Sequence, residues 1–317
     1  MPPERLTFGQ YVSDWLETAV KPTVRPYTFQ SYNMLVRKHI SPELGGVRLA
    51  RLTPQQIQGF LNEKLESGLS PRTVQYLHAV VRRALGQAER FGLVSRNVAR
   101  LVTPPRVPKA EVHPLTPGEV KRLLAVVQED RLSALYTVGV ALGLRQGEIM
   151  GLRWSAVNLE AGMLTVHTSF QWHDGKPQLA EPKTAKSRRT VRLPDVCIQA
   201  LHVHRGRQAL ERAYMGAAWQ NKDNLVFVQE DGRPLSRSAV THRFWRILEA
   251  AGIPKRRFHD LRHTCATLLL AQGVPLKVIQ ELLGHSLMST TADIYATVLP
   301  VLMTDAADKM DAILTGP

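Results

Sequence analysis

The sequence is poor in several features that would mark other classes of protein. Only two of its 317 residues are cysteines, and Cys197 and Cys265 fall in different predicted elements, so we expect buried thiols rather than a disulfide framework. No run of about 18 apolar residues is present, which argues against a membrane-spanning helix. Residues 1–7 lack the apolar region of a signal peptide. We therefore expect a cytoplasmic protein without a membrane partner.

Acidic residues are also scarce relative to basic ones. The chain has 41 Lys plus Arg against 27 Asp plus Glu, which gives a formal net charge of +14. A polyanion suits such an excess, because each Lys or Arg set against a phosphate releases a counterion. A cationic protein that binds a membrane surface is the alternative, but the charge favours nucleic acid. The chain is long enough for two domains, each with its own core.

Residues 1–102 have the pattern of a small helical bundle. Four amphipathic segments begin near Thr7, Pro26, Thr53 and Ser70, where a capping hydroxyl or a proline suits the first helical turn. Four short amphipathic helices make a compact bundle. The side chains on its exposed face either are solvated or contact phosphates, and the net charge favours phosphates. Those side chains are Arg72, His78, Arg82, Arg83 and Arg90.

Prolines concentrate in residues 103–116, which we interpret as an interdomain linker. Pro104, Pro105, Pro108 and Pro114 exclude a helix interior and favour extended chain. Lys109 adds a positive charge suited to a phosphate backbone.

Residues 117–317 begin with helical patterns and then change period. Arg145 follows a glycine turn in A-L-G-L-R-Q-G-E-I, at the start of a predicted helix, and Glu148 stands one turn further on. Residues 163–168 and 188–194 alternate apolar and polar positions as half-exposed strands do, and H-D-G-K between them predicts a hairpin turn. The segment E-P-K-T-A-K, just before the second strand, supplies Lys183 and Lys186.

The most distinctive stretch is F-H-D-L-R-H, followed by L-L-G-H-S and D-I-Y. His259 and Arg262 stand three apart, so they share one face of a helix. His285 follows a predicted glycine C-cap, and Tyr295 comes ten residues later. Arg257 ends a short basic run in front of His259.

These motifs resemble the active site of the tyrosine recombinases, the phage integrase family. The resemblance implies a mainly α fold with a small antiparallel β-sheet, built from an N-terminal helical, SAM-like core-binding domain and a catalytic domain. It implies that Glu148 is a supporting carboxylate and that Lys186 is the alternative to Lys183 as the catalytic lysine. The implied catalytic residues are Arg145, Lys183, His259, Arg262, His285 and the nucleophile Tyr295.

Those residue types suit transfer at a DNA phosphodiester without a metal or another cofactor. Two arginine forks can stabilise charge on the non-bridging oxygens. A tyrosine hydroxyl has a pKa near 10, so its attack needs a base, for which His259 is the candidate, while His285 donates to the phosphate. Lys183 is the candidate acid for the 5′-oxygen. The 3′-phosphotyrosine keeps the bond energy, so another strand can reverse the attack without ATP.

The resemblance also implies partners. We expect double-stranded DNA with a specific crossover site, a homo-tetramer on that DNA, and a possible directionality factor. The apolar spacing of residues 303–314 predicts a tail helix, which either folds back on its own core or docks on a neighbouring protomer. The small arm-site-binding domain of many integrases is not expected in this sequence. The residues predicted to contact DNA are Arg72, Arg82, Arg83, Lys109, Lys186 and Arg257.

Several other functions compete with this interpretation. The long interval between Arg145 and Lys183 favours an integrase of a phage or mobile element over an Xer-type dimer resolvase. H-D-L-R-H is close to the zinc-protease pattern H-E-x-x-H, but Asp260 is shorter than Glu and Arg262 would place a cation beside the metal. A DNA-binding protein of the same fold without chemistry is a further alternative. So is a type IB topoisomerase, but the two-domain layout and the spacing to Tyr295 favour a recombinase.

Overall fold

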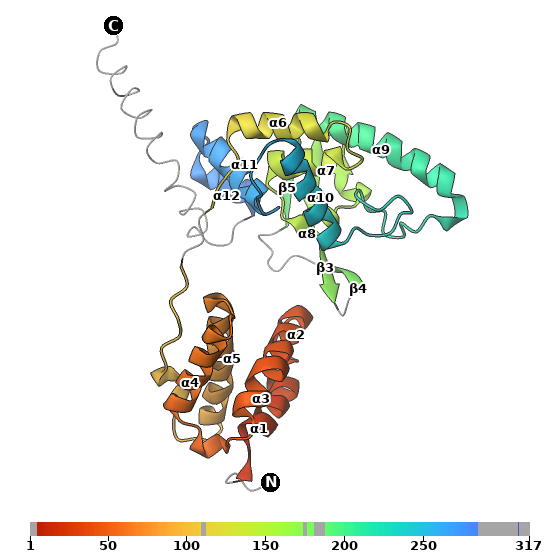
Figure 1. The fold of residues 1–317 in the computed structure, drawn as a ribbon. Helices are drawn as coiled ribbons and strands as arrows, with labels where there is room; N and C mark the ends of the chain where they lie inside the picture. The colour runs from red at the N-terminus through yellow and green to blue at the C-terminus, as the bar shows by residue number, and fades with distance from the viewer. Residues whose placement is uncertain (1–4, 109–111, 174–175, 181–187, 285–309, 311–317) are drawn as a thin grey trace. The chain divides into compact units, whose positions relative to one another are not determined.

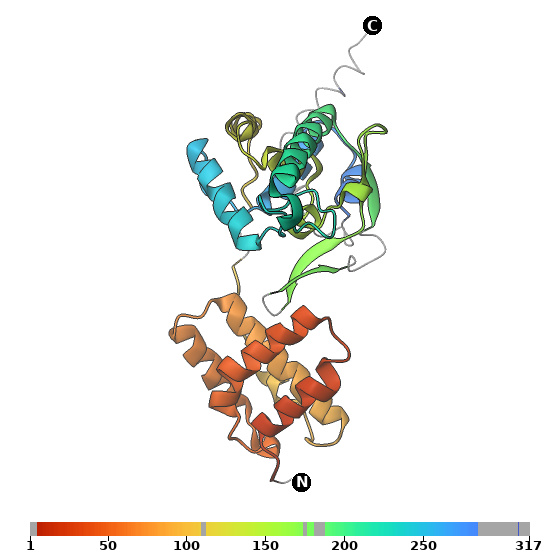
Figure 2. The same ribbon diagram turned by 90° about the vertical axis from the view of Figure 1, so that its right-hand side faces the viewer.

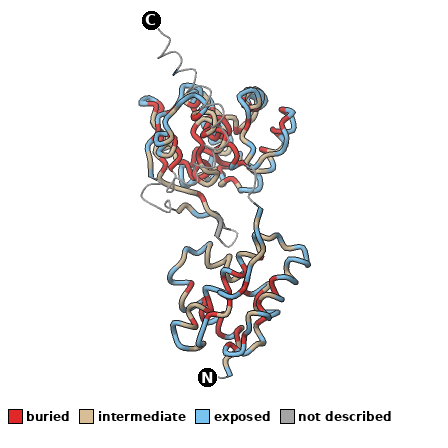
Figure 3. Tube along the Cα trace, turned by 90° about the vertical axis from the view of Figure 1, so that its left-hand side faces the viewer, coloured by how far each residue is buried: buried red, intermediate tan, exposed pale blue. Residues whose placement is uncertain are grey.

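The computed structural model describes residues 5–108, 112–173, 176–180, 188–284 and 310. The chain divides into two compact units, residues 1–110 and 111–317. Each unit encloses its own buried core, as Figure 3 shows. The division falls inside the proline-rich segment 103–116.

The first unit is a helical bundle (Figure 1). Its helices begin where local capping predicts. The hydroxyls of Thr7 and Thr53 each accept a hydrogen bond at 3.3 Å from the main-chain N–H three residues on, and Ser70 does so at 3.2 Å. The helices are α1 (Phe8–Trp15), which continues as the π-helical stretch Leu16–Val20; α2 (Pro26–Leu35), which continues as the π-helical stretch Val36–Ile40; the short α3 (Ser41–Leu44); α4 (Pro54–Glu66); and α5 (Pro71–Arg90).

Helix α5 supplies one whole side of this core. One side of the helix is buried and the opposite side keeps its arginines exposed; the buried apolar residues are Val74, Leu77, Val80, Val81, Ala84, Leu85 and Ala88. The structure corrects the prediction for His78. This residue is buried, and its Nε2 lies 2.8 Å from the carbonyl oxygen of Ala99. His78 therefore belongs to the core and not to the basic surface.

The two described ends of the proline-rich segment are attached to different units. At one end, the N–H of Thr103 donates to Gln58 and the amide of Gln75 donates to the carbonyl of Pro105, both at 3.1 Å. At the other end Leu115 is buried, and its N–H donates to the hydroxyl of Thr264 at 2.9 Å. Lys109 lies outside the described residues.

The second unit is built around α7, whose residues are almost all buried. Helices α6, α9 and α11 pack against it, and α12 packs against α11 (Figures 1 and 2). Helix α7 ends at Gly143, which adopts the left-handed conformation that a C-cap glycine favours. The helices are α6 (Pro117–Val127), α7 (Ser133–Leu142), α8 (Gln146–Met150), α9 (Asp195–Met215), α10 (Arg237–Ala250), α11 (Asp260–Ala271) and α12 (Leu276–Leu283).

The strands of this unit form two antiparallel sheets. The first has the order β1 (Val157–Asn158), β2 (Met163–Val166), β5 (Arg189–Arg192). The predicted strands β2 and β5 do pair, with Leu164 opposite Val191. The chain between them forms a separate ribbon of β3 (Ser169–His173) and β4 (Lys176–Ala180), which projects from the helices of this unit.

One predicted strand is absent from the described part of the chain. Residues 225–228 are buried as expected, but they make only isolated bridges, Arg153 with Leu225 and Val228 with Pro234. Both cysteines are buried and unpaired, as predicted. Among the described residues, no helix is long and apolar enough to cross a membrane.

Candidate active site

Three arginines from three different elements meet the last turn of α12. Arg189 Nε donates to the carbonyl of Leu282 at 2.6 Å, Arg262 donates to that of Leu283 at 2.6 Å, and Arg145 donates to that of Gly284 at 3.2 Å. The last carbonyls of a helix lack intrahelical partners and carry its negative dipole end. Guanidinium groups donate hydrogen bonds to these carbonyls and also place positive charge at the negative end of the dipole. The turn that directly precedes His285 is therefore held by three cations.

Arg262, on α11, is the most buried of the three residues, at 2% exposure. A second bond, 2.8 Å long, runs from its guanidinium to the carbonyl of Gly143 at the end of α7. Burial, together with the charge of Arg145, lowers the pKa of Arg262 to about 9, so it stays protonated at neutral pH. Two helix ends thus hold a fixed positive charge in the interior.

Gly143 and Gly284 make this arrangement possible. Both have positive φ angles, +57° and +66°, which L side chains rarely adopt. They also leave space for their neighbours, because a Cβ on Gly143 would lie 2.5 Å from Leu283 and one on Gly284 would lie 2.9 Å from Arg189. The two glycines let helices α7 and α12 end close together, with their carbonyls next to the arginines.

Arg145 is the N-cap residue of α8, and its side chain is 40% exposed. Its main-chain N–H and its guanidinium both donate to Glu148, at 3.0 and 2.7 Å. Helix α8 itself rests on β3 so closely that a Cβ on Gly147 would lie 2.9 Å from the carbonyl oxygen of Phe170. Arg145 therefore presents a positioned charge to solvent from a tightly packed support.

Glu148 joins Arg145 to Arg189, a residue that the sequence did not single out. The Arg189 guanidinium donates to the Glu148 carboxylate at 2.9 Å, and both side chains are less than 10% exposed. Burial alone would raise the pKa of Glu148, but the hydrogen bond and charge of Arg189, with Arg145, hold it below its ordinary value. The one available signal was an arginine in the R-R-T-V strand pattern, which is also typical of a solvated edge.

His259 is the N-cap residue of α11, one turn from Arg262. The ring keeps an exposed side, yet protein atoms surround much of it. This desolvation, together with the positive charge of Arg262 and the neighbouring His263, lowers its pKa to about 4. His259 is therefore neutral at pH 7 and can accept a proton.

The zinc-site alternative finds no further ligands in the described part of the chain. The rings of His259 and His263 meet edge to face, with centroids 5.1 Å apart. Within the described residues no group of three His, Cys, Asp or Glu side chains could hold a metal ion.

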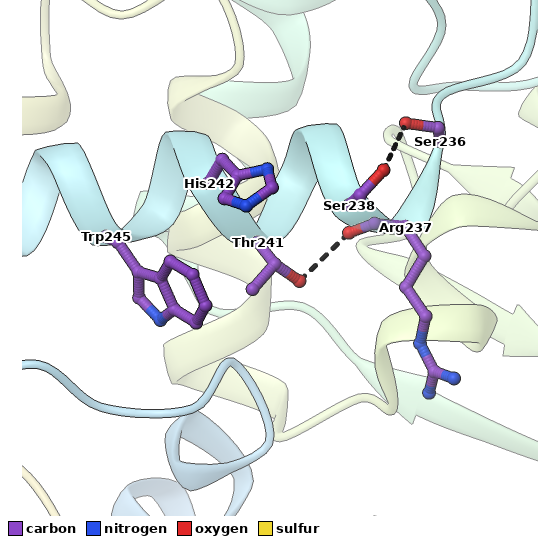
Figure 4. Close-up of a pocket in the computed structure, with 6 residues that line it drawn as sticks. All are labelled: Ser236, Arg237, Ser238, Thr241, His242 and Trp245. Atoms are coloured by element: carbon purple, nitrogen blue, oxygen red, sulfur yellow. Dashed lines mark hydrogen bonds between the residues drawn. The ribbon is translucent and has the colours of Figure 1, made fainter.

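A surface pocket lies along α10. The hydroxyls of Ser236 and Ser238 are 3.2 Å apart, and Thr241 donates to the carbonyl of Arg237 at 2.9 Å (Figure 4). The amide of Gln146, next to Arg145, also donates to that carbonyl, at 3.2 Å. The lining residues are mostly hydrogen-bonding: Ser236, Arg237, Ser238, Thr241, His242 and Trp245.

Trp245 also lines a second, basic depression near His259. Lys255 Nζ lies 3.6 Å from the centroid of the Trp245 ring, and Arg256 accepts a hydrogen bond from the indole through its carbonyl. Arg257 is exposed, but its guanidinium is paired with Asp260 at 2.8 Å, which raises its pKa. Polar and basic side chains thus extend from α10 toward the candidate site.

On the first unit, three of the predicted DNA-contacting arginines are exposed on α5. The Arg72 guanidinium lies 5.7 Å from the ring centroid of Tyr76, and that of Arg83 lies 5.6 Å from the ring of Tyr32. Arg82 is exposed as well. Basic and aromatic groups interleaved in this way suit nucleic acid.

The remaining predicted site residues lie outside the described residues. They are Lys109, Lys183, Lys186, His285 and Tyr295. The structure does bring the pair Arg145 and Glu148 together with the pair His259 and Arg262, although more than 100 sequence positions separate the two pairs.

Comparison with known families agrees with this arrangement. Residues 113–300 match the model of the phage integrase family, and residues 7–65 match that of the phage integrase N-terminal SAM-like domain. The chain therefore belongs to the phage integrase family, the tyrosine recombinases. Members of this class are site-specific DNA recombinases, and this chain is an enzyme of that class.

Individual relatives include both mobile-element and Xer-type proteins. A tyrosine recombinase XerC-like protein of Caldanaerobacter subterraneus subsp. tengcongensis is 32% identical, with 96% of this chain and 83% of the relative covered. An integrase of Saccharopolyspora erythraea is 28% identical, with 98% and 83% covered. The Tn1549 transposon integrase, solved in complex with transposon right end DNA, shares the fold with a TM-score of 0.79 at 20% identity, over 91% of this chain and 94% of that one.

Proposed function

We propose that this recombinase cuts and rejoins DNA through a 3′-phosphotyrosine intermediate at Tyr295. The observation that carries the proposal is the convergence of Arg145 and Arg262 on the end of α12, with His259 next to both charges. His285, ten residues before Tyr295, follows directly in L-L-G-H-S.

The two arginines act on the phosphate. As phosphorus becomes five-coordinate, negative charge accumulates on the non-bridging oxygens, and cations already in place stabilise it without reorganisation. Arg145 is the accessible member and meets the phosphate directly. Arg262, held by carbonyls of two helices, supplies a fixed charge behind it. His285, the residue after Gly284, is a further donor.

His259 and Lys183 move the protons. The Tyr295 hydroxyl attacks phosphorus as its proton passes to the neutral ring of His259. The bond to the 5′-oxygen breaks, and Lys183, or Lys186 in its place, protonates that oxygen. A pKa of about 4 makes the His259 ring a weak base in the DNA-free protein. The negative charge of a bound phosphate beside Arg145 and Arg262 raises that pKa toward the working range.

Basic surfaces on both units bind double-stranded DNA around a specific crossover site. On the first unit these include Arg72, Arg82 and Arg83 on α5, and on the second the polar face of α10 with the run ending at Arg257. Lys109 joins them from the linker. Recombination of two duplexes needs four cuts, so four copies of the chain assemble on the DNA, and a directionality factor can choose between forward and reverse reactions.

Integration and excision of a phage or other mobile element is the reaction we favour over resolution of chromosome or plasmid dimers. Integrases occur among the relatives, and the ribbon of β3 and β4 lengthens the segment between Arg145 and the candidate lysines. Xer-type relatives keep dimer resolution as the second candidate. An integrase joins two different sites, whereas a dimer resolvase joins identical ones, so recombination assays with both pairs distinguish the two.

The covalent step is tested with a nicked duplex whose sequence has been selected for binding from a random library. The wild-type protein is expected to form a species that survives denaturing electrophoresis, and Tyr295→Phe is expected to form none. Tyr214→Phe is the matched control, because that tyrosine is 91% exposed on α9 and plays no part in the proposed site. It should react like the wild type.

Three results would contradict the proposal. A covalent adduct that still forms with Tyr295→Phe would show that another residue is the nucleophile. Tight binding of the selected DNA without any adduct in the wild type would favour a DNA-binding protein without chemistry. Relaxation of supercoiled plasmid lacking the selected site would instead favour a topoisomerase.

A further inference from the structure

Arg189 has more contacts with the candidate site than its place in the sequence suggests. Its guanidinium bonds both to the carbonyl of Leu282, in the last turn of α12, and to the carboxylate of Glu148, on α8. It thus connects strand β5 both with α8, which begins at Arg145, and with α12, which ends just before His285. Its side chain is 7% exposed, so it does not meet the solvent face where DNA would bind.

Building on the function proposed above, we infer that Arg189 is a positioning residue for DNA cleavage. It keeps Glu148 ionised and holds the end of α12 in a fixed position relative to α8. The guanidinium of Arg145 then stays oriented toward the phosphate. In this role Arg189 acts through its bonds to Glu148 and Leu282.

The reasoning starts from the buried carboxylate. Glu148 is 4% exposed, and among the described residues the charged groups that face it are Arg145 at the start of its own helix, Arg189 from β5 and, at longer range, Arg262 from α11. A buried carboxylate that loses a cationic partner takes up a proton more readily. Protonated Glu148 would hold Arg145 less firmly, and Leu282 would lose the donor to its carbonyl. Loss of Arg189 should therefore make cleavage slower and add a pH dependence that comes from Glu148.

The test is single-turnover cleavage of the selected nicked duplex as a function of pH. For Arg189→Met we expect DNA affinity to stay within a few-fold of wild type while cleavage falls by about 10²-fold at neutral pH, the scale of a small misplacement of catalytic groups. The rate of Arg189→Met should gain an additional rise with pH as Glu148 ionises, beyond the rise that deprotonation of His259 gives the wild type. Arg189→Lys should restore much of the wild-type pH profile but not the full rate, because an ammonium cannot reproduce the fork of a guanidinium.

Two further variants separate positioning from a general loss of structure. Arg192→Met changes an exposed arginine on the same strand and should leave both the rate and the pH profile unchanged. In the Glu148→Gln background, Arg189→Met should no longer introduce any pH dependence, because the titrating group is gone. A pH profile unchanged in Arg189→Met, or a new dependence that persists without Glu148, would overturn the inference.

Thermal unfolding in the absence of DNA tests the pairing of Arg189 with Glu148 independently of DNA cleavage, and so independently of the proposed function. The difference in Tm between Arg189→Met and wild type should narrow as pH falls from 7 to about 5, because a Glu148 that has lost its main cation protonates at higher pH. A constant difference would refute the pairing even if the wild type cleaves DNA. Narrowing without any wild-type adduct would keep the pairing and refute the proposed function.

Discussion

Replacing Gly143 by alanine should damage the site through packing and not through charge. At a φ of +57°, an L side chain costs about 1–2 kcal/mol. The added Cβ would also lie 2.5 Å from Leu283 and 3.1 Å from Cys265, so one of the packed helices must move. Overpacking of this kind costs about 1–3 kcal/mol. The free energy of unfolding should therefore fall by roughly 2–5 kcal/mol.

The shift has a functional consequence because Leu283 carries an acceptor for Arg262. Moving α12 away from α7 lengthens the Arg262 bonds to Gly143 and Leu283, which are now 2.8 and 2.6 Å. We expect cleavage of the nicked duplex to fall by about 10²-fold, with binding retained.

Gly252→Ala is the matched control. Its φ is +63°, so it carries the same conformational cost, but no atom lies within 4 Å of the added Cβ. Urea unfolding of both variants should show Gly143→Ala less stable than Gly252→Ala by about 1–3 kcal/mol. Equal losses of stability, or normal cleavage by Gly143→Ala, would refute the close approach of α12 to α7.

Three further predictions follow from the described contacts. In the DNA-free protein, NMR should find that His259 titrates near pH 4. This pKa lies below the unfolded value of about 6.5, so the contribution of His259 to the free energy of unfolding is complete above pH 6.5 and is lost as the pH falls toward 4. A midpoint near 6.5 would contradict the desolvation. Thr264→Val leaves the buried N–H of Leu115 without its acceptor, so urea unfolding should show a loss of about 1–3 kcal/mol, and no loss would contradict this bond. If Arg72 and Arg83 contact phosphates, replacing both by alanine should make the slope of log binding constant against log salt concentration shallower by about 0.9 for each lost contact. An unchanged slope would show that these two arginines do not contact phosphates.

Much of the helical framework was predictable because its signals are local. Thr7, Thr53 and Ser70 cap the helices that the sequence predicts, because a capping hydroxyl lies close to the N–H three residues on whatever the surroundings. Gly284 ends α12 for the same reason. Errors arose where long-range packing decided. His78 shares its helix with exposed arginines, yet its ring is buried against Ala99.

The sequence by itself determined the family and the identity of the candidate site residues, because these are short motifs of reactive side chains. It could not predict that Arg145, Arg189 and Arg262 meet three successive carbonyls at the end of α12. Those bonds join residues 139, 93 and 21 positions apart, and no local pattern encodes them. Only the packing of α7, α11, α12 and β5 brings the charges together. Burial among those elements then lowers the pKa of His259 and leaves Glu148 ionised between two arginines.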